Sequence, residues 1–104
     1  MTAEFLSVFV TAPSYGEAEK IARSVVTENL AACANILSGA QSIYRWRGKV
    51  EQAAECVIFI KCAATQFDAL QARIRDLHSY ECPCIVATPI VAGNADYLNW
   101  LRGV

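Results

Sequence analysis

This sequence lacks the features of several large protein classes. No uninterrupted apolar run is long enough to cross a membrane, because Glu, Lys, Arg or turn residues break every stretch. No basic block occurs and the formal net charge is −1, which argues against nucleic acid as the main partner. Internal repeats and low-complexity segments are absent, and residues 1–4 lack the basic start of a signal peptide. We therefore expect a cytoplasmic protein that contacts neither a membrane nor nucleic acid.

Apolar character is what the sequence has in excess. Hydrophobic residues fill 55% of the 104 positions and charged residues only 18%. That balance is apolar for a small protein and favours buried contacts between subunits. A chain of this length can enclose one modest core but not two, so we expect a single domain over residues 1–104.

The five cysteines do not suggest a disulfide framework, because their number is odd and no secretion signal precedes them. Cys33, Cys56 and Cys62 lie in apolar strand-like sequence, where a free thiol behaves as a small buried hydrophobe. Cys82 and Cys84 form a tight C-x-C pair near the end of the chain.

The first third of the chain predicts a strand followed by a helix. β-branched and aromatic residues from Glu4 to Ala12 are typical of a strand, which Pro13 ends. Ser14 and Glu17 then stand at capping-box spacing, so that Ser14 caps the helix and Glu17 reaches back to it. The helix should end near Asn29. Its single buried stripe consists of Ala18, Ile21, Ala22 and Val25.

The stretch from Ala31 to Ala63 predicts one long β-hairpin folded at Gly48. Tyr44 and Trp46 alternate onto one face near the tip and Ile43 onto the other, so neither face is plainly polar. Sixteen extended residues would reach about 50 Å, whereas a domain of this size has a radius of gyration of about 13 Å. The ribbon should therefore bend or overhang the body. We expect other copies of the chain to cover it.

The last part of the chain predicts a helix, a strand and a short final helix. Thr65 to Asp68 offers a second helix cap, and the helix should stop near residues 78–80. Pro83 to Val91 predicts a strand in which Pro89 marks an edge or a bulge. Asn94 can cap the final helix. The apolar positions are Phe67, Leu70, Ile74 and Leu77 in the first helix and Tyr97, Leu98, Trp100 and Leu101 in the second.

The resulting order, β-α-β-β-α-β and a short helix, predicts an α+β ferredoxin-like sandwich with a long central hairpin and a short C-terminal helix. Both long helices should cover one face of an antiparallel sheet. The other face stays bare in a monomer, and a bare apolar face is an association surface.

Several segments, taken in order, resemble the CutA family of divalent-cation-tolerance proteins. The SxYxWxGK and YLxWL elements are the most specific of them. The matching segments are Ala32-Cys33-Ala34-Asn35-Ile36, Ser42-Ile43-Tyr44-Arg45-Trp46-Arg47-Gly48-Lys49, Ile60-Lys61, His78-Ser79-Tyr80-Glu81, and Gly93-Asn94 with Tyr97-Leu98-Asn99-Trp100-Leu101.

The resemblance implies a ferredoxin-like subunit in a stable homotrimer, whose hairpins pair with neighbouring subunits around a three-fold axis. Tyr44, Trp46 and Trp100 are then expected in the trimer interface, where aromatic side chains pack generously. The family is linked to tolerance of copper and other divalent metals, with copper binding in some members, and no accepted catalytic reaction comes with it. Its build is also similar to that of the PII signalling trimers.

The sequence departs from the family pattern where metal ligands are concerned. Ser79 and Cys84 replace a proline and a glutamate of the usual His-Pro-Tyr-Glu-x-Pro-Glu element. Some members carry a cysteine and a second histidine, assigned as copper ligands, where Val10 and Leu77 stand here. His78 is the one residue of that set that this chain keeps.

His78, Glu81, Cys82 and Cys84 are the candidate metal ligands. Thiolates and an imidazole suit copper(I) or zinc, and a trimer could bring three copies close together. Alternatively, His78 ends a helix, where its imidazolium interacts favourably with the helix dipole, and the two cysteines pack. The sequence leaves both interpretations open.

The remaining aromatic, basic and nucleophilic residues allow three further interpretations. Tyr44, Trp46, Tyr80 and Trp100 could line an inter-subunit cleft for a small molecule, as in a PII-like binding or scaffold module, or they could be interface packing. Arg45-Trp46-Arg47 could stack a base, but charged residues at a hairpin tip are the simpler explanation. No motif orients a nucleophile beside a base, so we expect no enzymatic activity.

Overall fold

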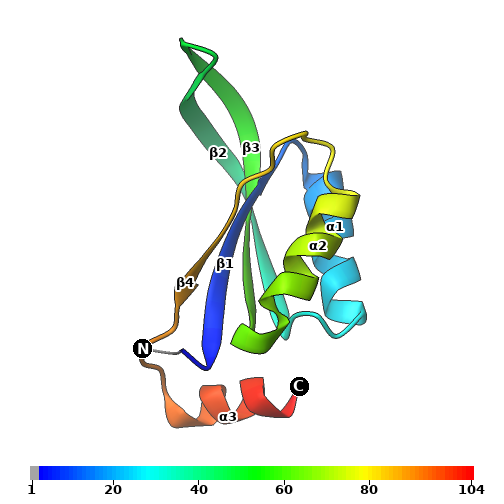
Figure 1. Ribbon diagram of the computed structural model, residues 1–104, viewed down its shortest axis with the longest axis vertical. Helices are drawn as coiled ribbons and strands as arrows, with labels where there is room; N and C mark the ends of the chain where they lie inside the picture. The colour runs from blue at the N-terminus through cyan, green and yellow to red at the C-terminus, as the bar shows by residue number, and fades with distance from the viewer. Residues whose placement is uncertain (1–2) are drawn as a thin grey trace.

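The computed structural model describes residues 3–104 as one antiparallel sheet with its helices on one face and at one end (Figure 1). No helix in this described range is both long and apolar enough to cross a membrane. The elements are β1 (Phe5–Ala12), α1 (Tyr15–Thr27), β2 (Cys33–Trp46), β3 (Lys49–Ala63), a 3-10 turn (Ala64–Gln66), α2 (Phe67–Leu77), β4 (Ile85–Pro89) and α3 (Ala95–Gly103). This is the predicted ferredoxin-like order.

The four strands lie in the order β2-β3-β1-β4, and every neighbouring pair is antiparallel. β1 is central, because it pairs with β3 on one side and with β4 on the other. β4 is shorter than the predicted strand over 83–91, since pairing with β1 begins only at Ile85. Its last residue is Pro89 on an edge strand, where a missing N–H costs least, as predicted.

α1 has both the buried stripe and the N-terminal cap that the sequence predicts. The Ser14 hydroxyl accepts a hydrogen bond from the Glu17 N–H at 3.2 Å. The helix ends at Thr27, and Asn29 follows with a φ of 62°, a left-handed conformation that asparagine tolerates. The four stripe residues, Ala18, Ile21, Ala22 and Val25, are all buried against the sheet.

α2 does not use the predicted cap, so that prediction is wrong. The 3-10 turn at Ala64–Gln66 runs directly into the helix, and Gln66 at the cap position makes no side-chain capping bond. Thr65 is already inside a helical turn and cannot supply an extended N-cap. The predicted stripe is nevertheless confirmed, because Leu70 and Ile74 are fully buried, with Phe67 and Leu77 packed against the same core.

The hairpin is as long as predicted, and part of it stands free of the body. β1 pairs with β3 only as far as Ala12 opposite Cys56, so Lys49–Glu55 of β3 has no partner except β2 (Figure 1). A register shift between Leu37 and Ala40, with Gly39 at a φ of 86°, bends the first arm. The molecule is therefore 43 Å long, shorter than a straight ribbon would make it.

The bare sheet face is present, as predicted. α1 and α2 cover one face of the sheet (Figure 1). The other face exposes Phe59 and Val86, and Phe59 packs edge-to-face on Phe9 with the ring centroids 5.7 Å apart. α3 lies across the end of the sheet and buries only Leu101 of its four predicted apolar residues. Asn94 is the N-cap residue of α3, as predicted, but it caps through its backbone carbonyl, which accepts from the Leu98 N–H at 3.1 Å, and its side chain makes no capping bond.

We expect Ile74→Ala to lower the free energy of unfolding by about 2–5 kcal/mol, because it opens a cavity under a fully buried side chain of α2. The exposed neighbour Arg75 provides the matched control, and Arg75→Ala should change stability by less than about 0.5 kcal/mol. Guanidinium denaturation at one fixed protein concentration measures both. Equal effects of the two substitutions would show that the core has been assigned wrongly.

Candidate functional site

A pocket of about 500 Å³ lies where the bare sheet face meets the overhanging hairpin, and we name it the Glu55 pocket. β1 contributes Phe9 and Thr11 to its lining, since alternate residues of the strand face away from the helices. β2 contributes Tyr44 and Trp46 from the overhang, and β3 contributes Glu55. The remaining lining residues are Ser42, Tyr80, Glu81, Cys82 and Cys84.

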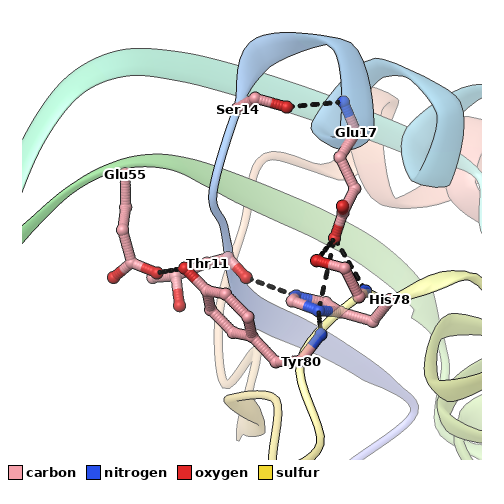
Figure 2. Close-up of polar contacts among 7 residues, drawn as sticks. Thr11, Ser14, Glu17, Glu55, His78 and Tyr80 are labelled. Carbon is pink, nitrogen blue, oxygen red and sulfur yellow. Dashed lines mark hydrogen bonds and ion pairs between the residues drawn. The ribbon is translucent and has the colours of Figure 1, made fainter.

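Glu55 is the one carboxylate of the pocket that is held in place. Glu55 is only 9% exposed, and its Oε2 atom accepts a hydrogen bond from the Tyr80 hydroxyl at 2.8 Å (Figure 2). Burial, and after it the neighbouring carboxylate, raises the pKa of Tyr80 to about 12. The phenol therefore stays protonated and remains the donor at neutral pH.

His78 is buried, and both of its ring nitrogens have protein partners (Figure 2). Nε2 lies 2.7 Å from the carbonyl oxygen of Thr11, which can only accept, so Nε2 carries the proton. Nδ1 accepts a hydrogen bond from the Tyr80 N–H at 3.1 Å. This arrangement leaves neither nitrogen free for a metal ion.

Glu17 has a different partner from the predicted one. Instead of reaching back to the helix cap, its Oε2 accepts hydrogen bonds from the N–H and the hydroxyl of Ser79, both at 3.0 Å. The same oxygen lies 3.4 Å from Nδ1 of His78 (Figure 2). The turn after α2 is thus fastened to the end of β1 and to the start of α1, which fixes the position of Tyr80 in the pocket.

The other predicted ligands lie at the surface. Cys82 and Cys84 are exposed, and desolvation together with the nearby Glu55 carboxylate raises the pKa of the Cys84 thiol. Within residues 3–104, no three side chains of His, Cys, Asp or Glu come together so that they could hold a metal ion. In this single chain, His78, Glu81, Cys82 and Cys84 therefore do not assemble a metal site.

The predicted interface aromatics are exposed but do not form one group. Tyr44 and Trp46 line the Glu55 pocket, whereas Trp100 lies on α3 at the other end of the sheet, beside Tyr97 at 5.5 Å (Figure 1). Three of the four aromatic residues predicted for a cleft line the pocket, namely Tyr44, Trp46 and Tyr80. Sequence reasoning missed Phe9, Thr11 and Glu55 as pocket residues, although the single acid beside the apolar run 56–60 was a usable signal.

Fold and site together define a ferredoxin-like domain whose central hairpin extends beyond its sheet and whose pocket opens at the base of that overhang. Residues 6–104 match the family described as CutA1 divalent ion tolerance protein. The chain belongs to this family.

Known proteins of several kingdoms resemble the chain over nearly its whole length. The divalent-cation tolerance protein CutA of Thermus thermophilus is 46% identical to this chain. The match covers 91% of this chain and 92% of the Thermus protein. A solved structure of the divalent cation tolerance protein from Thermus thermophilus superposes with a TM-score of 0.93, at 44% identity, and covers 95% of this chain and 96% of that one. Protein CutA 1, chloroplastic, of Oryza sativa is 40% identical over 97% of this chain, which spans only 57% of the rice protein. These descriptions name divalent-cation tolerance or CutA, and none of them names a reaction.

The pocket makes a prediction about alkaline pH. The pKa of Tyr80 rises from its usual value of 10 to about 12, so the stabilisation it reflects is present below pH 10 and is lost as pH climbs through 12. A pH titration followed by phenolate absorbance counts the tyrosines that ionise at high pH. Tyr80→Phe should show one fewer of these late-ionising tyrosines than the wild type. Glu55→Gln should move that step to lower pH, because it removes the repulsion between carboxylate and phenolate.

Circular dichroism recorded along the titration identifies the pH range in which the fold persists. Tyr15→Phe is the control, since Tyr15 is exposed on α1 and distant from Glu55 in sequence. A late step that is unchanged in Tyr80→Phe would contradict the assignment.

Proposed function

We propose that this chain works as a homotrimeric divalent-cation-tolerance protein in the cytoplasm, with residues 1–104 as one domain. The main support for a trimer is the overhanging part of the hairpin, which has apolar residues on both faces. Ile43 is 69% exposed on one face, and Tyr44 and Trp46 are 43% and 46% exposed on the other. A two-stranded ribbon is only marginally stable by itself in water, so we expect other protein surface to pack against it.

A second copy of the chain is the cover that best fits these surfaces. The bare sheet face, with Phe59 and Val86, is apolar as well and continues into the overhang. Burying such surface stabilises an assembly by about 25 cal/mol for each Å² removed from water. Family membership supports three copies, with Tyr44, Trp46 and Trp100 at their contacts. The cytoplasmic assignment is supported by five free cysteines, which a reducing compartment preserves.

We propose that metal binding, to copper or another divalent ion, is weak and is completed between subunits. Cys82, Cys84 and Glu81 are the accessible ligands, and soft thiolates favour copper(I). His78 can join them only if its ring gives up the hydrogen bonds to Thr11 and Tyr80. Family membership and the exposed C-x-C pair support this part of the proposal.

A second candidate function rests on the Glu55 pocket. A PII-like module binds small molecules in clefts of a trimer, and a volume of about 500 Å³ is within the range of ligand pockets. Its walls combine three aromatic side chains of the predicted cleft with one fixed carboxylate.

The trimer is tested by sedimentation equilibrium at micromolar concentration, where the wild type should give three times the chain mass of 11.4 kDa. Trp46→Ala should dissociate it or weaken it, because it removes the largest exposed side chain of the overhang. Lys20→Ala, on the outer surface of α1, is the control and should leave the mass unchanged. A monomeric wild type would end the proposal.

Metal binding is tested by calorimetric titration of reduced protein with Cu(I), Cu(II) and Zn(II). We expect Cu(I) to bind most tightly and the Cys82→Ser, Cys84→Ser double variant to lose most of that affinity, because it removes both thiolates. His78→Ala tests the histidine separately, and its stability must be measured with a chelator present. Binding that is absent, or equal in wild type and the cysteine variant, would remove the metal site.

A further inference from the structure

We propose that the Glu55 pocket is filled by the hairpin tip of a neighbouring copy, and that Arg47 of the partner subunit pairs there with the Glu55 carboxylate. This inference rests on the proposed trimer and names a contact that joins its copies. It is an alternative to the second candidate function, because a pocket that holds the partner subunit's Arg47 is closed to a small molecule.

The pocket carries negative charge without a cation. Glu55 and Glu81 belong to its lining, and no Lys, Arg or His does. Glu55 is only 9% exposed, and within residues 3–104 its carboxylate has the Tyr80 hydroxyl as its one hydrogen-bond partner and takes part in no ion pair. A partly desolvated carboxylate without an opposite charge is unfavourable. The pocket is therefore electrostatically incomplete in the single chain.

The hairpin tip carries positive charge without an anion. Arg45, Arg47 and Lys49 are all exposed, and in the described part of the chain none of them takes part in an ion pair. Arg47 lies in the turn itself with a φ of 50°, and its guanidinium is 5.5 Å from the ring centroid of Trp46. A guanidinium can bind a carboxylate through two parallel hydrogen bonds and can also stack on aromatic rings, so it fits a pocket with both.

The two charged groups cannot meet within one chain. In the hairpin register Glu55 lies opposite Ala40, whereas Lys49 lies opposite Trp46. The extended chain from Lys49 to Glu55 is about 20 Å long, and Arg47 lies beyond it. That separation exceeds the Debye length of about 8 Å at physiological salt. Any direct coupling between Arg47 and Glu55 must therefore join two copies.

The overhang gives the tip the reach to meet another copy. Pairing of β3 with β1 ends at Cys56, so residues 49–55 carry the tip about 20 Å past the sheet (Figure 1). Tip and pocket are different surfaces of one chain, so the contact is head-to-tail, and such contacts form a ring when the rotation closes. A ring of three copies fills every pocket with the next copy's tip. It also covers the pocket end of the bare sheet face.

A double-mutant cycle on Glu55→Gln and Arg47→Gln tests the pairing. Trimer dissociation is followed by sedimentation equilibrium in a fixed concentration of urea, which does not screen charges, and circular dichroism checks the fold of each variant. We expect each substitution to raise the dissociation constant by about tenfold or more, and the double variant to be little weaker than the weaker single variant. Lys20→Gln on the outer surface of α1 is the control, and its effect should simply add to that of Glu55→Gln.

Mixing the two single variants shows whether the pair joins different copies. A mixed trimer regains one intact contact, in which Arg47 of the Glu55→Gln chain enters the pocket of the Arg47→Gln chain. Neither homotrimer has an intact contact. With one variant isotope-labelled, native mass spectrometry after exchange should show mixed trimers above their statistical proportion.

The outcomes separate this contact from the trimer itself. A monomeric wild type overturns the trimer and the contact together. A trimeric wild type in which the effects of Glu55→Gln and Arg47→Gln simply add overturns the contact alone. Coupling in the cycle with only statistical mixing also overturns it, because the two residues would then act within one chain.

Discussion

The difference in length between β1 and β3 is the constraint on which the rest of this structure depends. β1 has eight residues and β3 has fifteen, and their pairing ends at Ala12 opposite Cys56. Beyond that point the hairpin has only its own two strands, so its side chains project into solvent on both faces. The overhang creates an exposed apolar surface. It also creates the pocket, whose walls are the end of β1, the free part of the hairpin and the segment from Tyr80 to Cys84.

The turn after α2 shows how a residue that resembles a metal ligand can serve the fold. His78 donates to the end of β1 and accepts from its own turn, while Glu17 holds Ser79 from the start of α1. The two bonds of His78 satisfy a buried imidazole, whose unpaired nitrogens would otherwise cost about 1–3 kcal/mol each. They also place the Tyr80 hydroxyl on Glu55, so the geometry of the pocket depends on a histidine that does not line it.

Metal tolerance and ligand binding make different demands on this chain. A metal site needs three or four donors in one place, and within residues 3–104 a single chain does not gather them. The Glu55 pocket instead combines a fixed carboxylate with aromatic side chains. Family membership is a property of the whole sequence and fold.

The sequence by itself determined the elements and the core, because these follow from neighbouring residues. Helical periodicity identified the buried residues of α1 and α2, and the alternation near Gly48 identified the hairpin. The Ser14 cap followed from local spacing, but tertiary structure alone decided the polar contacts of the turn after α2. Glu17 and Ser79 are 62 positions apart and Thr11 and His78 are 67 apart, so no local pattern encodes them. Local spacing even misled at Thr65, where a capping signal lies inside a 3-10 turn. A side chain's hydrogen-bond partner depends on which segments the fold brings together, and hydrophobic periodicity carries no information about that choice.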